Sequence, residues 1–465
     1  MSRLSRLLTV VLLGSVALAT PASAHGNTSA APPIPAWLLF LSAGGAVAVT
    51  AVVVSRMDAV PTAVDDVLVS VPARAGEAVR WVARTVFLVG FLAAIYTGLT
   101  GPQTPKEFAT VFVWPVWFKG LLVVSAVVGS PWRSLSPWET LYDLLARLEG
   151  EDPSLLAYPA GLGTWPAAFG FLVLIGFAEN LSAVPTSPRL TAVTIALYAT
   201  VMLVGGVVWG RDWFANADPL AAFYRLVGRV APLSIRRGEG ASGADEADGA
   251  DTGDFQIVQT SPWKACSEAL PDRGAAALAV AAVYTVSFDG LEATPEYQGL
   301  NVWAAETVGL GVYASLLLYV VGFFAFLGVF WLVVRLAAAL GEGDVRRATL
   351  AFGATLLPIA VGYDLAHNYP YVLRSLLAFV EVTTQQPVVA TPLAIVPPQA
   401  IWGTEVLLVV VGHVAAVLAA HTVSLRVFGS LDLARRGHAP VVVLMLGYTV
   451  LSLWVFSRPV VSTVG

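Results

Sequence analysis

The chain contains ten apolar stretches, each long enough to cross a lipid bilayer. We expect them near residues 36–55, 83–100, 110–129, 166–183, 190–209, 274–291, 308–336, 347–366, 405–424 and 439–457. Hydrophobic residues make up 57% of the 465 residues and charged residues only 12%, which leaves too little polar surface to cover a water-soluble fold. The stretches lack the period-two alternation of a membrane barrel. The sequence therefore predicts an all-α, polytopic transmembrane helix bundle whose environment is the lipid bilayer.

Charge and cysteine content exclude several other classes of protein. The net charge is −5 and no basic stripe is present, so the chain is not expected to bind nucleic acid. The single cysteine, Cys266, excludes a disulfide scaffold and a thiolate metal cluster. No zinc-protease, P-loop or nucleophile-elbow motif occurs in the sequence. Whether the protein is an enzyme stays open at this stage.

The first 24 residues have the pattern of a cleavable signal peptide. Arg3 and Arg6 precede an apolar run over residues 7–18, and small residues follow up to Ala24. Cleavage after Ala24 would make His25 the mature N-terminus and place it outside the cell membrane. The alternative is an uncleaved anchor, for which the apolar run is short.

Lysine and arginine residues are distributed unequally between the loops. With the mature N-terminus outside, nineteen of them fall on the inner side and four on the outer side. This bias predicts a multi-pass cell-membrane protein whose N-terminus and C-terminus both lie outside. It also supports the number of spans, because one missed helix would invert every later loop.

Three segments organise the mature chain. A first membrane half with five spans covers 25–235, an acidic flexible inner linker covers 236–262, and a second half with five spans covers 263–465. Residues 131–149 place four leucines on one helical face beside Trp132 and Trp138, which predicts an inner amphipathic helix at the membrane surface. This helix and the acidic linker are possible docking segments for a membrane-protein partner.

Ionisable groups inside predicted spans are rare and are therefore functional candidates. Several lie near the outer ends of the spans, and Asp364 and His367 are spaced to share one helix face. Pro358 is expected to kink this helix and Pro370 to end it. Two imidazoles with carboxylates suit zinc or copper, and the amine of an N-terminal histidine favours copper. The predicted metal ligands are His25, Glu179, Asp289, Asp364 and His367. The plain alternative is that these groups cap helices or are solvated.

A second group of polar residues lies deeper in the predicted bundle. His413 and His421 are eight residues apart, about 12 Å along a helix, so one metal ion cannot bind both. They are predicted as stations of a polar path together with Lys119, which needs a partner or a route to water. The plain alternative for His421 is an interfacial position. His438 is expected to be solvated in an inner loop.

With these residues in view, the chain resembles the fenitrothion hydrolase-like family of polytopic membrane proteins. The resemblance rests on five blocks in order, namely 129–138, 286–291, 357–369, 412–421 and 447–454, and on Ala24-His25-Gly26 near the start. The family name implies organophosphate-ester hydrolysis, without catalytic residues to carry over. The blocks contain Asp289, His367, His413 and His421. Lys119, where an apolar residue is expected, and the acidic insert at 236–257 depart from the family pattern.

Three functions follow as alternatives. The first is binding or handling of copper or zinc at an outward-facing pocket of histidines and carboxylates. The second is membrane-bound hydrolysis of phosphoesters by a metal-activated water at the same pocket, with Asp289 or Asp364 as the base. The third is a non-catalytic membrane subunit or assembly factor, whose polar residues only hold helices together.

Overall fold

The computed structural model describes residues 36–57, 62–238, 253–388 and 396–458, and these are mostly helical. Among them, eight helices are long and apolar enough to cross a membrane. Each coincides with a predicted span, and two shorter apolar helices, 41–55 and 165–179, fall on the other two. The prediction of a helical membrane bundle is therefore confirmed at this level. His25 and the predicted signal peptide lie outside the described residues.

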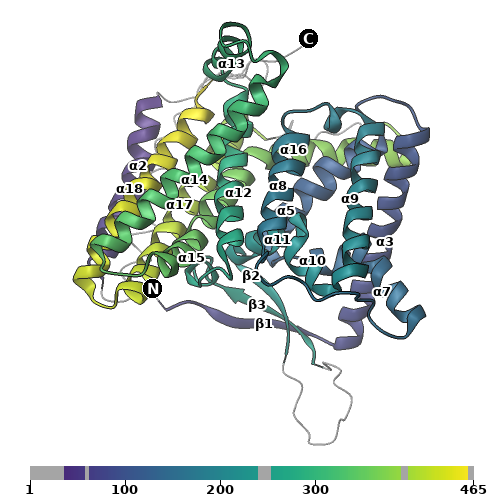
Figure 1. The fold of residues 1–465 in the computed structure, drawn as a ribbon, viewed down its shortest axis with the longest axis horizontal. Helices are drawn as coiled ribbons and strands as arrows, with labels where there is room; N and C mark the ends of the chain where they lie inside the picture. The colour runs from purple at the N-terminus through teal and green to yellow at the C-terminus, as the bar shows by residue number, and fades with distance from the viewer. Residues whose placement is uncertain (1–35, 58–61, 239–252, 389–395, 459–465) are drawn as a thin grey trace, which may run out of the picture.

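The helices form two groups that lie side by side (Figure 1). The N-terminal bundle consists of α3 (Ala73–Thr100), α4 (Phe108–Val111), η1 (Phe112–Lys119), α5 (Gly120–Val128), α6 (Trp132–Leu135), α7 (Pro137–Glu149), α8 (Trp165–Phe171), η2 (Leu172–Glu179), η3 (Val184–Thr186), α9 (Pro188–Trp209), α10 (Arg211–Ala217), α11 (Pro219–Val227) and η4 (Gly228–Val230). The C-terminal bundle consists of α12 (Arg273–Glu292), α13 (Pro295–Val302), η6 (Trp303–Thr307), η7 (Gly311–Tyr313), α14 (Ala314–Leu340), α15 (Val345–Thr355), α16 (Leu357–Thr384), α17 (Pro398–Phe428) and α18 (Leu431–Phe456), preceded by η5 (Ala265–Ser267).

The first described helix, α2 (Ala36–Ser55), belongs to the C-terminal bundle, where it packs on α17 and α18. The predicted halves divide the chain by sequence, and α2, which lies in the first of them, is grouped in space with helices of the second. The two bundles meet where α12 contacts α8 and where α16 contacts η1 and α4. This seam between the bundles contains the candidate site.

A three-stranded antiparallel sheet lies at one end of the helices, which we call the sheet side (Figure 1). Its order is β1 (Asp65–Val71), β3 (Phe255–Thr260) and β2 (Leu233–Arg237), with Ile235 opposite Ile257 in the register. The sequence did not predict these strands. Because β3 lies within residues 236–262, the predicted flexible linker is wrong for that part, while residues 239–252 lie outside the described chain.

The predicted amphipathic helix is present as α7. Trp138, Tyr142 and Ala146 recur every four residues and are buried, whereas Leu144 and Leu148 are exposed on the opposite face. Arg84 of α3 donates to the Asp143 carboxylate at 2.5 Å, which ties the helix to the bundle. The exposed leucines fit the headgroup region of a bilayer.

The α7 carboxyl group of Glu139 gives a pH-dependent prediction. Burial first, and the nearby Asp218 carboxylate second, raise the pKa of Glu139 to about 7 from a usual 4.5. The folded state therefore holds this proton more tightly than the unfolded chain, so the free energy of unfolding falls as pH rises from about 4.5 to about 7. Glu139→Gln should remove this dependence and stabilise the protein above pH 7 by about 1 kcal/mol, a value discounted for partial exposure.

Unfolding curves recorded at pH 4.5 and pH 8 would check the Glu139 prediction. The matched control is Glu149→Gln at the exposed end of the same helix. Parallel pH profiles for wild type and Glu139→Gln would contradict it.

The aromatic core of the N-terminal bundle is organised around the carboxylate of Asp218 at the N-cap of α11. Asp218 is fully buried and accepts hydrogen bonds from Trp132 Nε1 at 3.1 Å, from Trp138 Nε1 at 2.8 Å and from the Tyr198 hydroxyl. Backbone amides of Leu220 and Ala221 donate to its other side at 2.9 and 3.1 Å. One charged group therefore satisfies five donors in a dry core, which gives the group a structural role.

Helix α16 carries two of the predicted site residues and differs from its predicted form. It begins at Leu357, with Pro358 in its first turn, and continues through Pro370 to Thr384. The prediction that Pro370 ends this helix is wrong. In lipid a continuing helix keeps the remaining backbone groups paired, so a proline is tolerated there. Close packing of α16 on α17 needs Gly412, because a Cβ atom there would collide with the Pro358 carbonyl oxygen.

Candidate functional site: a buried charge cluster

Lys119 lies at the seam between the bundles, next to two carboxylates. Its Nζ atom is 3.2 Å from Glu179 Oε1 and 3.9 Å from Asp364 Oδ1. The Lys119 side chain is 6% exposed, and the Glu179 and Asp364 side chains are 14% and 10% exposed. Glu179 comes from the same bundle as Lys119, and Asp364 comes from the C-terminal bundle. The lysine, predicted as part of a polar path, is thus an ion-pair partner of two predicted metal ligands.

The two residues of the N-terminal bundle are positioned by π-helical turns. Lys119 is the last residue of η1 and Glu179 the last residue of η2. In η1 the amide of Gly120 donates to the Pro115 carbonyl five residues earlier. Pro115 itself has no amide hydrogen to donate, which favours such a rearranged turn. Because π-turns are rare and occur often at functional sites, their coincidence with both charged residues supports a functional role.

A second pair of residues borders the same site. His367 Nε2 lies 3.2 Å from Asp289 Oδ2, and their side chains are 32% and 27% exposed. The His367 ring stacks on Tyr363 at a centroid distance of 6.1 Å. Asp364 and His367 take part in neighbouring pairs of the site, as their three-residue spacing predicts. We call Lys119, Glu179, Asp289, Asp364 and His367 the charge cluster.

A small cavity joins four of these residues. Lys119, Glu179, Asp289 and Asp364 line it together with apolar side chains such as Phe118 and Phe223. Its volume is about 10 Å³, which is room for about one water molecule. Glu179 Oε2 and the amide nitrogen of Asn180 are buried without a hydrogen-bond partner among the described residues. Three carboxylates share one ammonium and one imidazole, so the cluster retains negative charge unless it holds a proton or a cation.

The predicted metal site is complete neither in composition nor in geometry within the described chain. His25 lies outside the described residues, and no three of the described His, Cys, Asp and Glu side chains are arranged to hold a metal ion. The Lys119 ammonium already lies beside the two carboxylates that would have to bind such an ion. Metal binding by Glu179, Asp289, Asp364 and His367 stays a prediction.

The remaining histidines lie deep in the C-terminal bundle. His413 is fully buried, and its Nδ1 donates to the Val409 carbonyl at 2.8 Å. His421 is also buried, with Nε2 3.1 Å from the carbonyl of Met57, which follows the end of α2; the interfacial alternative for it stays a prediction. His438 is 2% exposed and lies within α18, so its predicted solvated position in a loop is wrong. Its ring centroid is 5.4 Å from that of His421.

The structure adds residues that sequence reasoning did not single out. Asn368 Nδ2 donates to Asp364 Oδ1 at 2.5 Å and holds that carboxylate in place. The two residues are four apart on one helix, so the i to i+4 rule could have found the pair. Tyr363 precedes His367 by four residues in the same way.

Comparisons with known proteins add no identification. No protein-family model, no curated protein and no solved structure matches the chain. The resemblance to the fenitrothion hydrolase-like family therefore stays a prediction, and function is argued from the site alone.

Proposed function

We propose that this protein is an integral membrane carrier that binds and releases protons at the charge cluster. The observation that carries the proposal is the position of Lys119, buried between Glu179 of its own bundle and Asp364 of the other bundle. Ionisable groups inside a membrane are costly and are retained mainly along ion and proton pathways. The cavity beside them has room for about one water molecule, which suits a proton as the bound species.

The arrangement of the contacts supplies a mechanism. Separation of the two bundles would break the contact of Lys119 with Asp364 while leaving its contact with Glu179. Asp364 would then lack its counter-charge and take up a proton, since a buried carboxylate without a partner favours the neutral form. Return of Lys119 would favour release of the proton. Transporters commonly bind their coupling ions between two such helix groups.

The alternatives from the sequence are less well supported by the same geometry. A metal ion at Glu179 and Asp364 would have to displace or repel the Lys119 ammonium. A phosphotriester does not fit a cavity of about 10 Å³. A purely structural role does not account for the buried Glu179 Oε2, which has no hydrogen-bond partner among the described residues.

Infrared spectroscopy of the purified protein in liposomes tests the proposal. We expect a carbonyl stretch from a protonated carboxyl group that appears and disappears as the pH is changed. The band should be lost in Asp364→Asn, and it should be weakened in Glu179→Gln. Asp432→Asn, at a carboxylate that is 85% exposed, is the matched control and should leave the band unchanged. If no cluster carboxyl titrates, the ion pairs are permanent and the proton-carrier proposal fails.

We also propose the finer topology for this carrier, with ten spans, a cleaved leader and both chain ends outside the cell membrane. The arginine-rich loops then lie on the inner side, which is the sheet side. Single cysteines introduced into Cys266→Ser protein test this, because Cys266 is the only native thiol and is fully buried. Labelling of sheet-side positions by an impermeant reagent in intact cells would overturn the orientation.

A further inference from the structure

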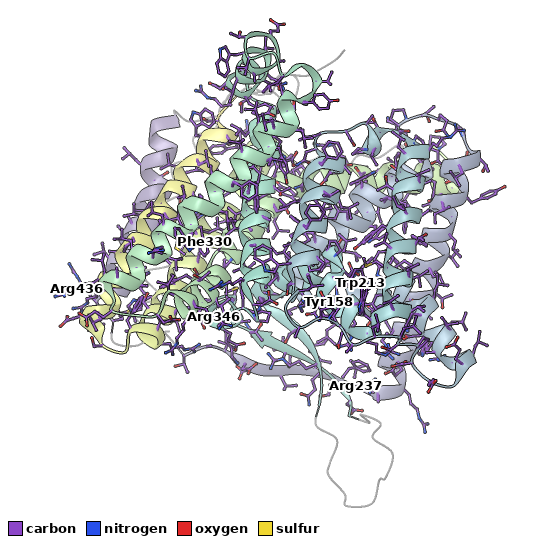
Figure 2. The ribbon with its side chains drawn as sticks, viewed as in Figure 1. Tyr158, Trp213, Arg237, Phe330, Arg346 and Arg436 are labelled. Carbon is purple, nitrogen blue, oxygen red and sulfur yellow. The ribbon has the colours of Figure 1, made fainter. Side chains whose placement is uncertain are left out.

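A large groove opens between the bundles, away from the charge cluster. It lies between α14, α15, α12 and the start of α8, and has a volume of about 800 Å³. Arg273, Arg335 and Arg346 border it, and the apolar side chains Phe324, Leu327 and Phe330 line it. Figure 2 shows Arg346 towards the sheet side and Phe330 farther from it. We call this feature the arginine groove.

Among the described residues, the three arginines form no salt bridge with a carboxylate. All three are exposed, and within the described residues none has a carboxylate oxygen within 4.0 Å of its guanidinium nitrogens. The Cζ atom of Arg335 lies 4.5 Å from the centroid of the Trp331 ring. Guanidinium groups bind phosphate oxygens strongly when several converge on one site.

The two acidic residues beside these arginines are already engaged elsewhere. Asp272 accepts hydrogen bonds from the Ala275 amide at 2.9 Å and from Thr164, and so caps α12. Asp344 accepts from the Arg347 amide at 2.7 Å and caps α15. A polar cavity of about 390 Å³ adjoins the groove and shares Trp165, Arg273 and Arg346 with it. With three guanidinium groups against these two carboxylates, the polar end of the groove carries net positive charge and has room for an anionic group.

The other end of the groove is apolar and runs along α14. Eleven residues separate Phe324 from Arg335, which is about 16 Å along the helix axis. Gly328 lies between them, and a Cβ atom added there would meet nothing within 4 Å. Trp331, close to Arg335, suits the level of lipid headgroups. An occupant that matches both ends has a phosphate-like head and a long apolar tail.

We propose that the arginine groove binds an anionic phospholipid. Its phosphate lies among Arg273, Arg335 and Arg346, and one acyl chain follows α14 past Gly328. Basic pockets between membrane helices are known to hold such headgroups. A lipid held there contacts both bundles, through Trp165 of α8 and through α12, α14 and α15.

Native mass spectrometry of the full-length protein in detergent, titrated with phosphatidylglycerol, tests this proposal. Wild type should bind phosphatidylglycerol more tightly than phosphatidylcholine, and added salt should weaken the binding. Arg273→Gln with Arg346→Gln should weaken it roughly 25-fold, about fivefold for each arginine. The matched control is Arg436→Gln, an exposed arginine at the far edge of the C-terminal bundle that should bind like wild type (Figure 2).

A second variant separates a lipid from a free anion. Gly328→Leu keeps every arginine and fills the path of the acyl chain, so it should weaken phosphatidylglycerol binding and leave the arginines available. Gly447→Leu, at another open glycine on α18, is its control. Equal binding of phosphatidylglycerol and phosphatidylcholine would show that the bound lipid is unselective annular lipid, and this would overturn the proposal. If Gly328→Leu binds phosphatidylglycerol as tightly as wild type, and inorganic phosphate competes with the lipid in both proteins, the groove is a small-anion site and the proposal is overturned.

Discussion

Lys119→Met should destabilise the folded protein by about 3–5 kcal/mol. Methionine keeps most of the length of the side chain but removes the ammonium that lies within 4 Å of Glu179 and Asp364. Two carboxylates would then remain in a buried site without a counter-charge, which costs more than a lost surface ion pair. Unfolding of the purified protein in mild detergent, followed by tryptophan fluorescence, measures the change.

Two further variants make the Lys119 result specific. Lys106→Met removes an exposed lysine and should change stability by less than about 0.5 kcal/mol. Lys119→Met combined with Glu179→Gln should be more stable than Lys119→Met alone, because one uncompensated carboxylate is also removed. If Lys119→Met unfolds like wild type, the cluster carboxyls are neutral in the folded state and the ion-pair network does not exist.

Asp218→Ala should destabilise the N-terminal bundle by a similar amount, about 3–5 kcal/mol. The change leaves the indole N–H groups of Trp132 and Trp138, the Tyr198 hydroxyl and two backbone amides without an acceptor in a dry core. It also removes the N-cap of α11. The emission of the buried tryptophans should shift to longer wavelength as water reaches them.

Asp218→Asn should lose less stability, because the amide oxygen can still accept hydrogen bonds from part of this set. Asp212→Ala, at an exposed carboxylate on α10, is the matched control and should unfold like wild type. Equal loss in Asp218→Asn and Asp218→Ala would show that the negative charge, not the hydrogen-bond acceptor, is what the core requires.

The membrane helices could be predicted because lipid imposes a requirement on each segment separately. A spanning segment must be apolar and must pair its own backbone groups, and both conditions can be checked within one stretch of sequence. The same approach does not predict the sheet. Its strands are only five to seven residues long, and Asp65 pairs with Thr260, which lies far from it along the chain. No local pattern carries that pairing, so the sequence alone predicts only a flexible acidic linker in this region.

Four of the five residues of the charge cluster were among the predicted metal ligands, whereas Lys119 was assigned to a separate polar path and the pairing was not predicted. Placing ionisable residues by depth selected Glu179, Asp289, Asp364 and His367. Such residues are rare inside apolar spans, so they stand out in the sequence before their partners are known. Which of them would meet Lys119 depends on how α16 crosses η1, and that is decided by packing rather than by spacing. The need of Lys119 for a partner was visible in the sequence; the identity of the partner was not.

The error at His438 has a simpler cause. The last span was expected to begin at residue 439, but α18 begins at Leu431, and the Ser430 hydroxyl accepts from the Leu433 amide as its N-cap. Arg435 and Arg436 near the helix start suggested a loop. A capping serine before an apolar run is a helix-start signal, and greater weight on it would have placed His438 in the helix.

The position of α2 has a consequence for biogenesis. This helix is translated before the other described helices, yet its packing partners, α17 and α18, are the last of them to be made. Its contacts with these two helices can therefore form only after α17 and α18 have been translated. A chain truncated before α17 would leave α2 without both of these packing partners.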